Sequence, residues 1–229
     1  MIPVIVLRPE PGCDATVVAA QGRGLDARGF PLFRVEPRVW DAPEPESVDA
    51  LLLGSANALR HGGPALSRYA GKPAYAVGEQ TARAARTADL DVVATGAGGL
   101  QQVLADIRPP HRRLLRLAGE ARVTLHVPPG VTIIERVVYA SMPAPLPDAL
   151  ASLLAQPALV MLHSAEAARH FAQECARRGV DRTQVALAAL GPRIVAAAGE
   201  RWRACEAADR PSEAALLALA CRMCEGPDP

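Results

Sequence analysis

The sequence predicts a two-lobed α/β protein with parallel sheets, and three observations support this prediction. Short apolar strands alternate with helices along the chain, which is typical of parallel sheets covered by helices. A strand–turn–helix pair at residues 48–85 returns at residues 158–199. Ser55 and Ser164, which occupy matching turns, are 109 positions apart, and such a repeat indicates a duplicated unit. Finally, two proline-rich segments divide the chain between the copies.

Length and composition are consistent with two small domains. The 229 residues suffice for two domains of about 100–120 residues each. Half of the residues are hydrophobic and only 3% are aromatic, so we expect a core of Ala, Leu and Val. No apolar run reaches the roughly 20 residues that span a bilayer. The first residues lack the basic segment of a signal peptide, so we predict a cytoplasmic protein.

Charge and cysteine content point away from several classes of partner. The net charge of +1 selects neither a nucleic acid nor a membrane, so we expect neither as a partner. The five cysteines are an odd number and do not predict a disulfide framework. Cys221 and Cys224 form a lone CxxC, which we interpret as one face of the last helix. A metal or redox role for this pair is the alternative.

The first segment contains the start of one lobe and a connector. Residues 4–7 are a continuous apolar run and predict a buried strand. Asp14 is suited to cap the helix expected at residues 15–22. Residues 30–35 and 38–40 are expected to be extended. The acidic, proline-rich connector that follows is the first candidate domain boundary.

The middle segment alternates between strands and helices. The expected strands lie at residues 50–53, 74–77, 90–94 and 114–117, with a helix after each of the first two and another at residues 100–107. Residues 131–139 are rich in β-branched residues and predict an extended segment. Pro143, Pro145 and Pro147 end that segment and form the second boundary.

The last segment repeats the pattern. Its expected elements are a helix at 148–155, a strand at 159–162, a helix at 165–178, a strand at 185–190, a helix from Pro192, a weak strand at 203–207 and a helix at 213–223. Gly179 is placed to end the long helix, and Ser212 is placed to cap the last one. Residues 226–229 are expected to be disordered.

The two boundaries predict how the lobes are composed. The first lobe is discontinuous and consists of residues 1–36 plus 143–229, so it contains both ends of the chain. The second lobe takes residues 41–131. Residues 37–40 and 132–142 are then linker strands that run between the two lobes.

The turns that follow the strands are the expected functional region. Ligands of open parallel sheets bind beyond the carboxyl ends of the strands, where small residues and free backbone N–H groups favour anions. The predicted substrate-binding residues are Arg8, Ser55, Ala56, Asn57, Gly78, Thr81, Gly119, Arg122, Ser164 and Gly191. The alternative is that the serines and glycines only cap helices and form tight turns. Their recurrence in both copies favours binding.

Familiar catalytic motifs are missing from the sequence. It has no dinucleotide-binding glycine motif, no phosphate-binding loop, no zinc-protease motif and no GxSxG nucleophile elbow. His163 precedes Ser164, but neighbours on a strand point to opposite faces. We therefore do not expect these two residues to act as a catalytic pair.

Several short sequences, taken in order, resemble the uroporphyrinogen-III synthase family. They are VLRP at 6–9, LLLGSANAL at 51–59, AVGEQTA at 76–82, LLRLAGEAR at 114–122, RVVYA at 136–140, VMLHSAEAA at 160–168 and ALGP at 189–192. The resemblance covers residues 4–220. It implies two flavodoxin-like lobes joined by a two-stranded linker, which agrees with the arrangement inferred from the repeat.

The resemblance also implies an activity. Members of this family are lyases of porphyrin and heme biosynthesis, and their product also leads to siroheme and cobalamin. Their substrate is hydroxymethylbilane, a linear tetrapyrrole polycarboxylate. The enzyme removes its terminal hydroxyl as water and closes the macrocycle with inversion of ring D through a spirocyclic intermediate. No metal or organic cofactor is implied. We expect a monomer that receives its substrate from hydroxymethylbilane synthase.

The resemblance assigns roles to individual residues. Tyr139 matches the tyrosine proposed to donate a proton to the departing hydroxyl; the alternative is an aromatic that packs a linker strand against a lobe. Thr81, Ser55, Asn57 and Ser164 match positions that line the substrate site. Arg8 and Arg122 are suited to charge-assisted bonds with substrate carboxylates. The chain departs from its relatives after Gly191 and Pro192, where it has Arg193, Ile194 and Val195 in place of a hydroxyl residue.

Two other functions remain compatible with the same fold, because a fold does not fix a function. The first is a non-catalytic, two-lobed regulatory module that binds a tetrapyrrole or another anion, which the missing hydroxyl near Ile194 favours. The second is a flavin- or phosphate-binding protein, for which the sequence offers no suitable loop. The presence of Tyr139, Thr81, Ser55 and Ser164 favours the enzyme.

Overall fold

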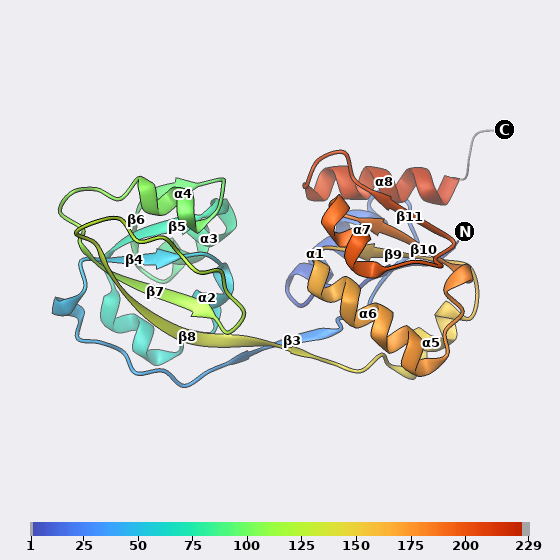
Figure 1. Cartoon of the computed structure of the whole chain (residues 1–229), viewed down its shortest axis with the longest axis horizontal. Coiled ribbons are helices and arrows are strands. Elements are labelled where there is room, and N and C mark those ends of the chain that lie inside the picture. The colour runs from blue at the N-terminus through green and yellow to red at the C-terminus, as the bar shows by residue number, and fades with distance from the viewer. Residues whose placement is uncertain (1, 226–229) are drawn as a thin grey trace. The chain divides into compact units, whose positions relative to one another are not determined.

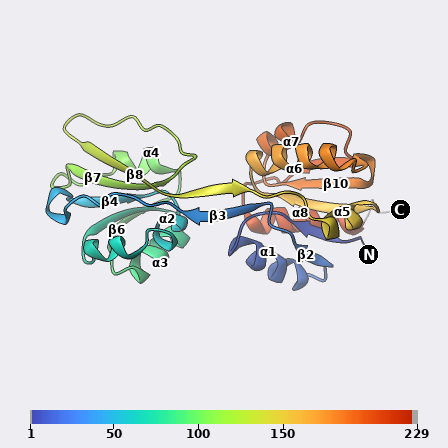
Figure 2. The same cartoon turned by 90° about the horizontal axis from the view of Figure 1, so that it is seen from below.

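The computed structural model describes residues 2–225 and divides into two compact units. Unit 1 contains the described residues up to Arg34 and from Met142 onward, and unit 2 contains Val35–Ser141. Each unit has its own sheet with helices on both faces (Figures 1 and 2). The predicted fold class, two α/β lobes with parallel sheets, is therefore confirmed. None of the helices within residues 2–225 is long and apolar enough to cross a membrane.

Unit 1 is built on a five-stranded parallel sheet in the order β11-β10-β9-β1-β2. Its strands are β1 (Val4–Val6), β2 (Ala27–Gly29), β9 (Ala158–Leu162), β10 (Val185–Ala189) and β11 (Ala204–Ala207). Its helices are α1 (Gly12–Gln21), α5 (Asp148–Leu154), α6 (Ala165–Arg178), α7 (Pro192–Ala198) and α8 (Glu213–Glu225), with a short 3-10 turn, η3 (Arg182–Gln184).

Alternating residues of these strands build two cores. Ile5 and Val160 face a core that includes α5, α6 and α7, whereas Val4, Leu159 and Met161 face a second core with α1 and α8. The three central strands, β1, β9 and β10, are apolar and buried at every position because both faces of the sheet are covered there. This explains why the sequence shows continuous apolar runs.

Unit 2 is built on a six-stranded sheet in the order β3-β8-β7-β4-β5-β6. Its strands are β3 (Phe33–Pro37), β4 (Ala50–Leu53), β5 (Pro73–Val77), β6 (Asp91–Gly96), β7 (Arg113–Gly119) and β8 (Thr132–Pro143). Its helices are α2 (Ala56–Arg60), α3 (Gly78–Thr87) and α4 (Leu100–Ala105), with 3-10 turns η1 (Pro45–Ser47) and η2 (Pro64–Tyr69). Leu51 and Leu115 face α2 and α3, and Leu52 and Leu114 face α4.

The two sheets are circular permutations of one arrangement. When the parallel strands of unit 2 are numbered along the chain with β4 as strand 1, their spatial order is 3-2-1-4-5. Unit 1 has the same order when β9 is strand 1 and the numbering continues from β11 to β1 and β2. The repeat seen in the sequence therefore aligns β4 with β9 and β5 with β10. In each sheet the strand order reverses at one point, between β4 and β7 in unit 2 and between β9 and β1 in unit 1. Ligands of doubly wound sheets bind at such switch points.

The structure corrects the predicted elements near the N-terminus. Helix α1 begins at Gly12 rather than at residue 15, so Asp14 lies inside its first turn and is not the cap. The helix starts early because the turn after β1 already bonds the N–H groups of Gly12 and Cys13 to the carbonyl oxygen of Pro9. Strand β2 lies at Ala27–Gly29, before the extended segment predicted at residues 30–35.

Other elements match the prediction closely. Helix α6 has the predicted bounds, and Gly179 ends it with φ of 67°. Ser212 caps α8, because its Oγ accepts a hydrogen bond of 3.3 Å from the N–H of Ala215.

Residues 38–40, predicted to be extended, form no strand, although the N–H of Arg38 still bonds to the carbonyl oxygen of Val138. The tail predicted to be disordered, residues 226–229, lies outside the described residues.

All five cysteines are free thiols. Cys221 and Cys224 both lie on α8 and pack against the second core of unit 1. Within residues 2–225, no group of three or more His, Cys, Asp or Glu side chains is placed to hold a metal ion.

Candidate functional site

Matching serines cap helices after the first strand of each repeat. Ser55 Oγ accepts a hydrogen bond of 3.2 Å from the N–H of Asn57, and Ser164 Oγ accepts one of 3.1 Å from the N–H of Ala167. The two serines thus have the capping role that the sequence left as an alternative. A capping hydroxyl accepts through a lone pair and keeps its own proton, so both serines retain a donor for a ligand.

A pocket of about 220 Å³ lies at the switch point of unit 2, beyond the carboxyl ends of β4 and β7. It brings together four of the residues predicted from the sequence, namely Ser55, Gly119, Arg122 and Tyr139. Its other lining residues are Gly54, Leu100, Arg116, Leu117, Ala118, Ala121 and Val123. The pocket is therefore the candidate functional site of this unit.

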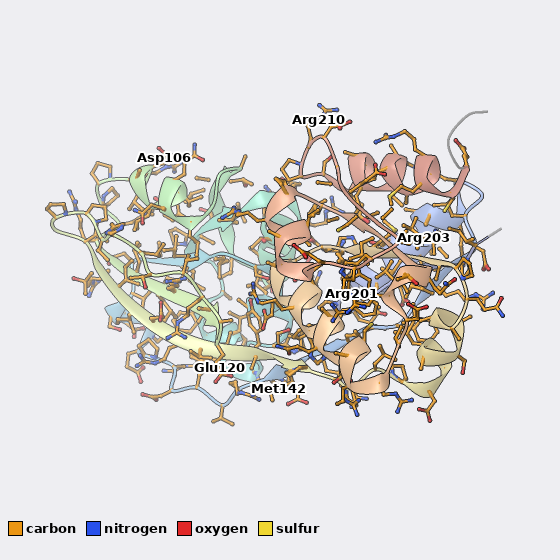
Figure 3. The ribbon with its side chains drawn as sticks, turned by 45° about the vertical axis from the view of Figure 1, so that its right-hand side comes forward. Asp106, Glu120, Met142, Arg201, Arg203 and Arg210 are labelled. Atoms are coloured by element: carbon orange, nitrogen blue, oxygen red, sulfur yellow. The ribbon has the colours of Figure 1, made fainter. Side chains whose placement is uncertain are left out.

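Tyr139 lies across the end of β7. A Cβ atom at Gly119 would be 2.7 Å from Cζ of Tyr139 and 2.9 Å from its hydroxyl, so a residue with a side chain would displace the ring. Gly119 and Tyr139 are register partners after a bulge at Ala118, and the N–H of Glu120 bonds to the carbonyl oxygen of Tyr139 over 2.9 Å. These contacts fix the backbone of β8 beside β7. The phenol occupies the space that a side chain at position 119 would fill. Glu120 itself is exposed in the turn (Figure 3).

His61 is a neighbour of Tyr139 that the sequence analysis did not single out. It ends α2, and its ring centroid lies 6.3 Å from that of Tyr139. Burial lowers the pKa of His61, and the charge of Arg60 lowers it further. Both effects favour the neutral form of the imidazole beside Tyr139.

Two arginines give this pocket an excess of positive charge. Arg116 lies on β7 with its side chain 4% exposed, and its Nη1 donates to Glu135 over 2.7 Å. Nε of Arg122 donates to the same carboxylate, and its Nη1 donates to the carbonyl oxygen of Glu120 over 2.8 Å. Two guanidinium groups share one carboxylate, so the local charge is positive. Arg116 Nε has no hydrogen-bond partner among residues 2–225.

Arg116 and Glu135 were not predicted from the sequence. The signal was available in part, because Arg116 interrupts an otherwise apolar strand, and a buried charge calls for a partner. The partner Glu135 lies on the neighbouring strand, 19 residues away. Arg122, predicted as a free carboxylate binder, is instead already paired.

In unit 1 the predicted residues lie beyond the carboxyl ends of adjacent strands. Arg8 follows β1 and Ser164 follows β9, which pair in parallel. Arg8 is paired with Glu213 at 3.1 Å. His163 also contacts Glu213, at 3.2 Å, and makes no hydrogen bond with Ser164 among the described residues. Gly191 begins α7 in an extended conformation with open space beside it.

The remaining predicted residues lie outside the lining of the unit 2 pocket. Gly78 begins α3 with φ of 75°, a conformation that favours glycine. Ala56 and Thr81 are 5% and 4% exposed. Asn57 accepts a hydrogen bond from Arg60 over 3.0 Å. A larger pocket of about 640 Å³ in unit 1 lies beside α8 and β11 and contains none of the predicted residues.

Comparison with known proteins gives one family. The family model described as uroporphyrinogen-III synthase HemD matches residues 14–218. The structure of uroporphyrinogen-III synthetase from Helicobacter pylori 26695 is similar to this chain, with a TM-score of 0.65, 16% identity, and coverage of 96% of this chain and 99% of that chain. A mutant uroporphyrinogen III synthase from the extremely thermophilic bacterium Thermus thermophilus is similar with a TM-score of 0.52 and 17% identity, over 99% and 100% of the two chains. At these identities the likeness is one of fold. No curated protein sequence matches the chain.

Proposed function

Because this chain belongs to the uroporphyrinogen-III synthase family, we propose that its pocket at the carboxyl ends of β4 and β7 holds the reacting end of the substrate, with Tyr139 as proton donor. The enzyme is a lyase of tetrapyrrole biosynthesis. It closes hydroxymethylbilane to uroporphyrinogen III with loss of water and inversion of ring D. What remains to be assigned is the part that each side chain plays.

Tyr139 is proposed to protonate the departing hydroxyl. Its phenol lies over Gly119 in the lining of the pocket, and a phenolic O–H both donates and accepts hydrogen bonds. Loss of the proton leaves a negative oxygen, which the excess positive charge of Arg116 and Arg122 stabilises. The main support for the proposal is that the Tyr139 phenol and the two arginines, Arg116 and Arg122, line the same pocket.

Orientation supplies the rest of the catalysis. The substrate is flexible, and ring D must attack through its substituted carbon, so the protein has to hold the chain bent. Ser55 offers a hydroxyl and Arg122 a guanidinium in the lining of the pocket. The small residues Gly119 and Ala118 let the ligand approach the end of β7 closely. These groups bind and orient the substrate without a covalent intermediate on the protein.

The other predicted contacts are proposed to hold the remaining carboxylates. Arg8, Ser164 and Gly191 lie in turns that follow strands of unit 1, and Asn57 and Gly78 lie in the first turns of α2 and α3 in unit 2. Ala56 and Thr81 are buried, so they contribute through backbone and packing. The support for this set is its recurrence at the carboxyl ends of strands, where ligands of such sheets bind.

We also propose that the chain works as a monomer in the cytoplasm and receives its substrate from hydroxymethylbilane synthase. Free thiols throughout the chain are typical of a reducing compartment. The exposed large apolar side chains among the described residues are few and are divided between the two units, namely Val18 and Met142 in unit 1 and Val39, Val123 and Val127 in unit 2. Residues 37–40, although they form no strand beyond Pro37, and residues 132–142 are proposed as the segments that link lobes at 1–36 plus 143–229 and 41–131.

The test is the isomer made from fresh substrate. The purified protein is incubated with freshly generated hydroxymethylbilane, the products are oxidised, and the isomers are separated by chromatography. Isomer III in excess over the uncatalysed isomer I is expected. Isomer I alone, from protein shown to be folded by circular dichroism, would contradict the assigned activity. The same assay on Tyr139→Phe separates the proton-donor role from the activity as a whole.

A further inference from the structure

A carboxylate of the chain itself is held at the switch point of unit 1. Arg8 follows β1, Thr16 lies on α1, His163 follows β9 and Glu213 begins α8. Nη1 of Arg8 donates to Oε2 of Glu213 over 3.1 Å, and the Thr16 hydroxyl donates to Oε1 over 2.6 Å. Nε2 of His163 lies 3.2 Å from Oε2. Side chains from three separate elements therefore converge on one carboxylate.

The surroundings fix these three side chains in place. Thr16 is 1% exposed, and the His163 side chain is 10% exposed, with an Nδ1 that has no partner among residues 2–225. Gly12 makes room for Arg8, because a Cβ atom there would lie 2.5 Å from Nε of Arg8. The side chains of Arg8 and Glu213 nevertheless remain 32% and 38% exposed. The carboxylate therefore sits on a rigid base and is reached from solvent.

Glu213 is not needed to begin its own helix. Ser212 caps α8 through its side chain to the N–H of Ala215, and its carbonyl oxygen accepts from the N–H of Leu216 over 3.0 Å. A Glu213 carboxylate that turned toward solvent would still lie in the first turn of α8, where the helix dipole favours a negative charge. Arg210, in the loop that leads into α8, is exposed and projects away from the unit (Figure 3).

We propose that Arg8, Thr16 and His163 form a carboxylate-binding site, which Glu213 fills until a carboxylate of the substrate replaces it. The proposal rests on the proposed function, because hydroxymethylbilane supplies the carboxylates. One carboxylate replaces another on the same donors, so the exchange leaves no charged group of the site without a partner.

The internal carboxylate also makes the site selective. A lone carboxylate from solution competes poorly with Glu213, which is tethered beside the site at a high effective concentration. A substrate that is anchored by its other carboxylates overcomes this competition, because its local carboxylate is tethered as well. The site therefore favours polycarboxylate ligands over small acids such as acetate.

The first experiment empties the site and refills it from solution. Glu213→Ala is expected to unfold at a lower temperature than wild type. About 100 mM acetate is expected to raise its Tm by about 3 °C relative to the same concentration of chloride, because a ligand that binds only the folded state stabilises it. Wild type is expected to show no such difference. If Glu213→Ala does not fold in chloride, recovery of folded protein in acetate is the readout.

Two further variants make this test specific. Glu44→Ala removes an exposed carboxylate that pairs with Arg68 at 2.7 Å in unit 2, and acetate is expected to leave its Tm unchanged. Thr16→Val in the Glu213→Ala background removes a donor of the site, and the acetate effect is expected to disappear. An equal response to acetate in Glu213→Ala and Glu44→Ala would overturn the proposed site.

The second experiment asks whether the substrate uses the site. Glu213→Ala removes the internal competitor, so the KM for hydroxymethylbilane is expected to fall by about three- to tenfold. An unchanged or higher KM would overturn the exchange with substrate. Failure of wild type to make isomer III would instead contradict the proposed function, and the acetate measurement would still decide whether the carboxylate site exists.

Discussion

The two units have the same strand arrangement but different chemistry at their switch points. In unit 2, Arg116 and Arg122 share the single carboxylate of Glu135, and the phenol of Tyr139 lies in the same pocket. In unit 1, one arginine, Arg8, is matched by one carboxylate, Glu213. Unit 2 therefore presents an excess of positive charge beside a phenol, whereas unit 1 presents an arginine paired with a carboxylate.

This difference shows what a duplication preserves. The backbone features recur, because the strand order and the serine caps depend on local sequence and on the geometry of parallel sheets. An arginine follows the equivalent strand in both units, Arg8 after β1 and Arg122 after β7, but its carboxylate partner differs: Glu135 comes from β8 in unit 2, and Glu213 comes from the start of α8 in unit 1. Equivalent folds thus carry different tasks. This difference supports our proposals that the reacting end of the substrate binds unit 2 and that unit 1 holds a carboxylate.

Tyr139→Phe, which alters the switch point of unit 2, is expected to have the largest effect on activity of the variants proposed for the two units. The substitution removes the phenolic hydroxyl and keeps the ring over Gly119. The rate constant kcat for isomer III is expected to fall by about 10²- to 10⁴-fold, the usual range for loss of a general acid, with little change in KM. The measurement is the initial rate of isomer III formation, resolved by chromatography.

Tyr69→Phe is the matched control for this prediction. Tyr69 belongs to the same unit, is fully buried, and its hydroxyl donates to the carbonyl oxygen of Pro43 over 2.6 Å. The control is expected to cost about 1 kcal/mol of stability and to leave kcat unchanged. A kcat of Tyr139→Phe within about twofold of wild type would remove the proton-donor role.

Glu135→Ala in unit 2 is expected to lower the free energy of unfolding more than Glu213→Ala in unit 1. Arg116 is almost fully buried, so loss of Glu135 leaves a buried charge without its partner and is expected to cost about 3–5 kcal/mol. Arg8 and Glu213 are each about one-third exposed, so loss of Glu213 is expected to cost only about 1–2 kcal/mol. The measurement is unfolding in urea.

Each unit has its own fluorescent reporter for this comparison. Trp40 in unit 2 stacks on Tyr69, and Trp202 in unit 1 stacks on Phe171. Single-tryptophan proteins, made by Trp202→Phe or Trp40→Phe, therefore report unit 2 or unit 1 separately. Glu79→Ala, which removes an exposed pair with Arg86, is expected to stay within about 0.5 kcal/mol of its parent. Equal losses for the Glu135 and Glu213 variants would contradict the difference in burial.

The parts of the site that depend on local sequence were predictable. Ser55, Ser164 and Ser212 cap helices through bonds to residues two or three positions ahead, so a short stretch of sequence contains both partners. The same holds for the apolar strands and the end of α6. The repeat also indicated which turns correspond. The fold class and the turn that contains Ser55 therefore followed from the sequence.

The charge pairs were not predictable in this way. Arg8 and Glu213 are separated by 205 positions, and their contact exists only because β1 joins the sheet between β2 and β9. The pairing of Arg116 with Glu135 depends on the register between β7 and β8. For this reason the sequence presented Arg8 and Arg122 as free cations, whereas the structure shows each of them with a carboxylate.

Gly119→Ala is expected to affect catalysis without unfolding unit 2. The new Cβ meets only the outer part of the Tyr139 ring, which is half-buried, so the ring is expected to shift at a small cost in stability. A displaced phenol no longer reaches the departing hydroxyl, and kcat is expected to fall by about 10- to 100-fold.

A double-mutant cycle tests whether this loss passes through Tyr139. In the Tyr139→Phe background, Gly119→Ala is expected to add little further loss, because the hydroxyl is already gone. A full additional loss in the double variant would show that Gly119 acts on the substrate independently of the phenol.

Acid is expected to weaken unit 1 through Glu213, and this is the smallest of the predicted effects. Burial raises the pKa of Glu213, but hydrogen bonds from His163 and Thr16 and the nearby positive charges outweigh it and hold the pKa at about 2, below the ordinary 4.5. A lowered pKa stabilises the folded state above about pH 4.5, and this contribution is lost as the pH falls toward 2. Because the carboxylate is 38% exposed, solvent screening limits the loss to about 1–2 kcal/mol.

Glu213→Gln should remove this component of the acid response. With Trp202 as reporter, the free energy of unfolding of unit 1 is expected to fall less steeply between pH 5 and pH 2 than in the parent. The slope does not vanish, because hydrogen bonds from Arg177 keep the pKa of Glu174 at about 2 in both proteins. With Trp40 as reporter, the acid response of unit 2 is expected to be unchanged. Identical slopes for unit 1 in the two proteins would mean that Arg8, Thr16 and His163 do not hold the ionised carboxylate in solution, and the contrast between the two switch points would then rest on unit 2 alone.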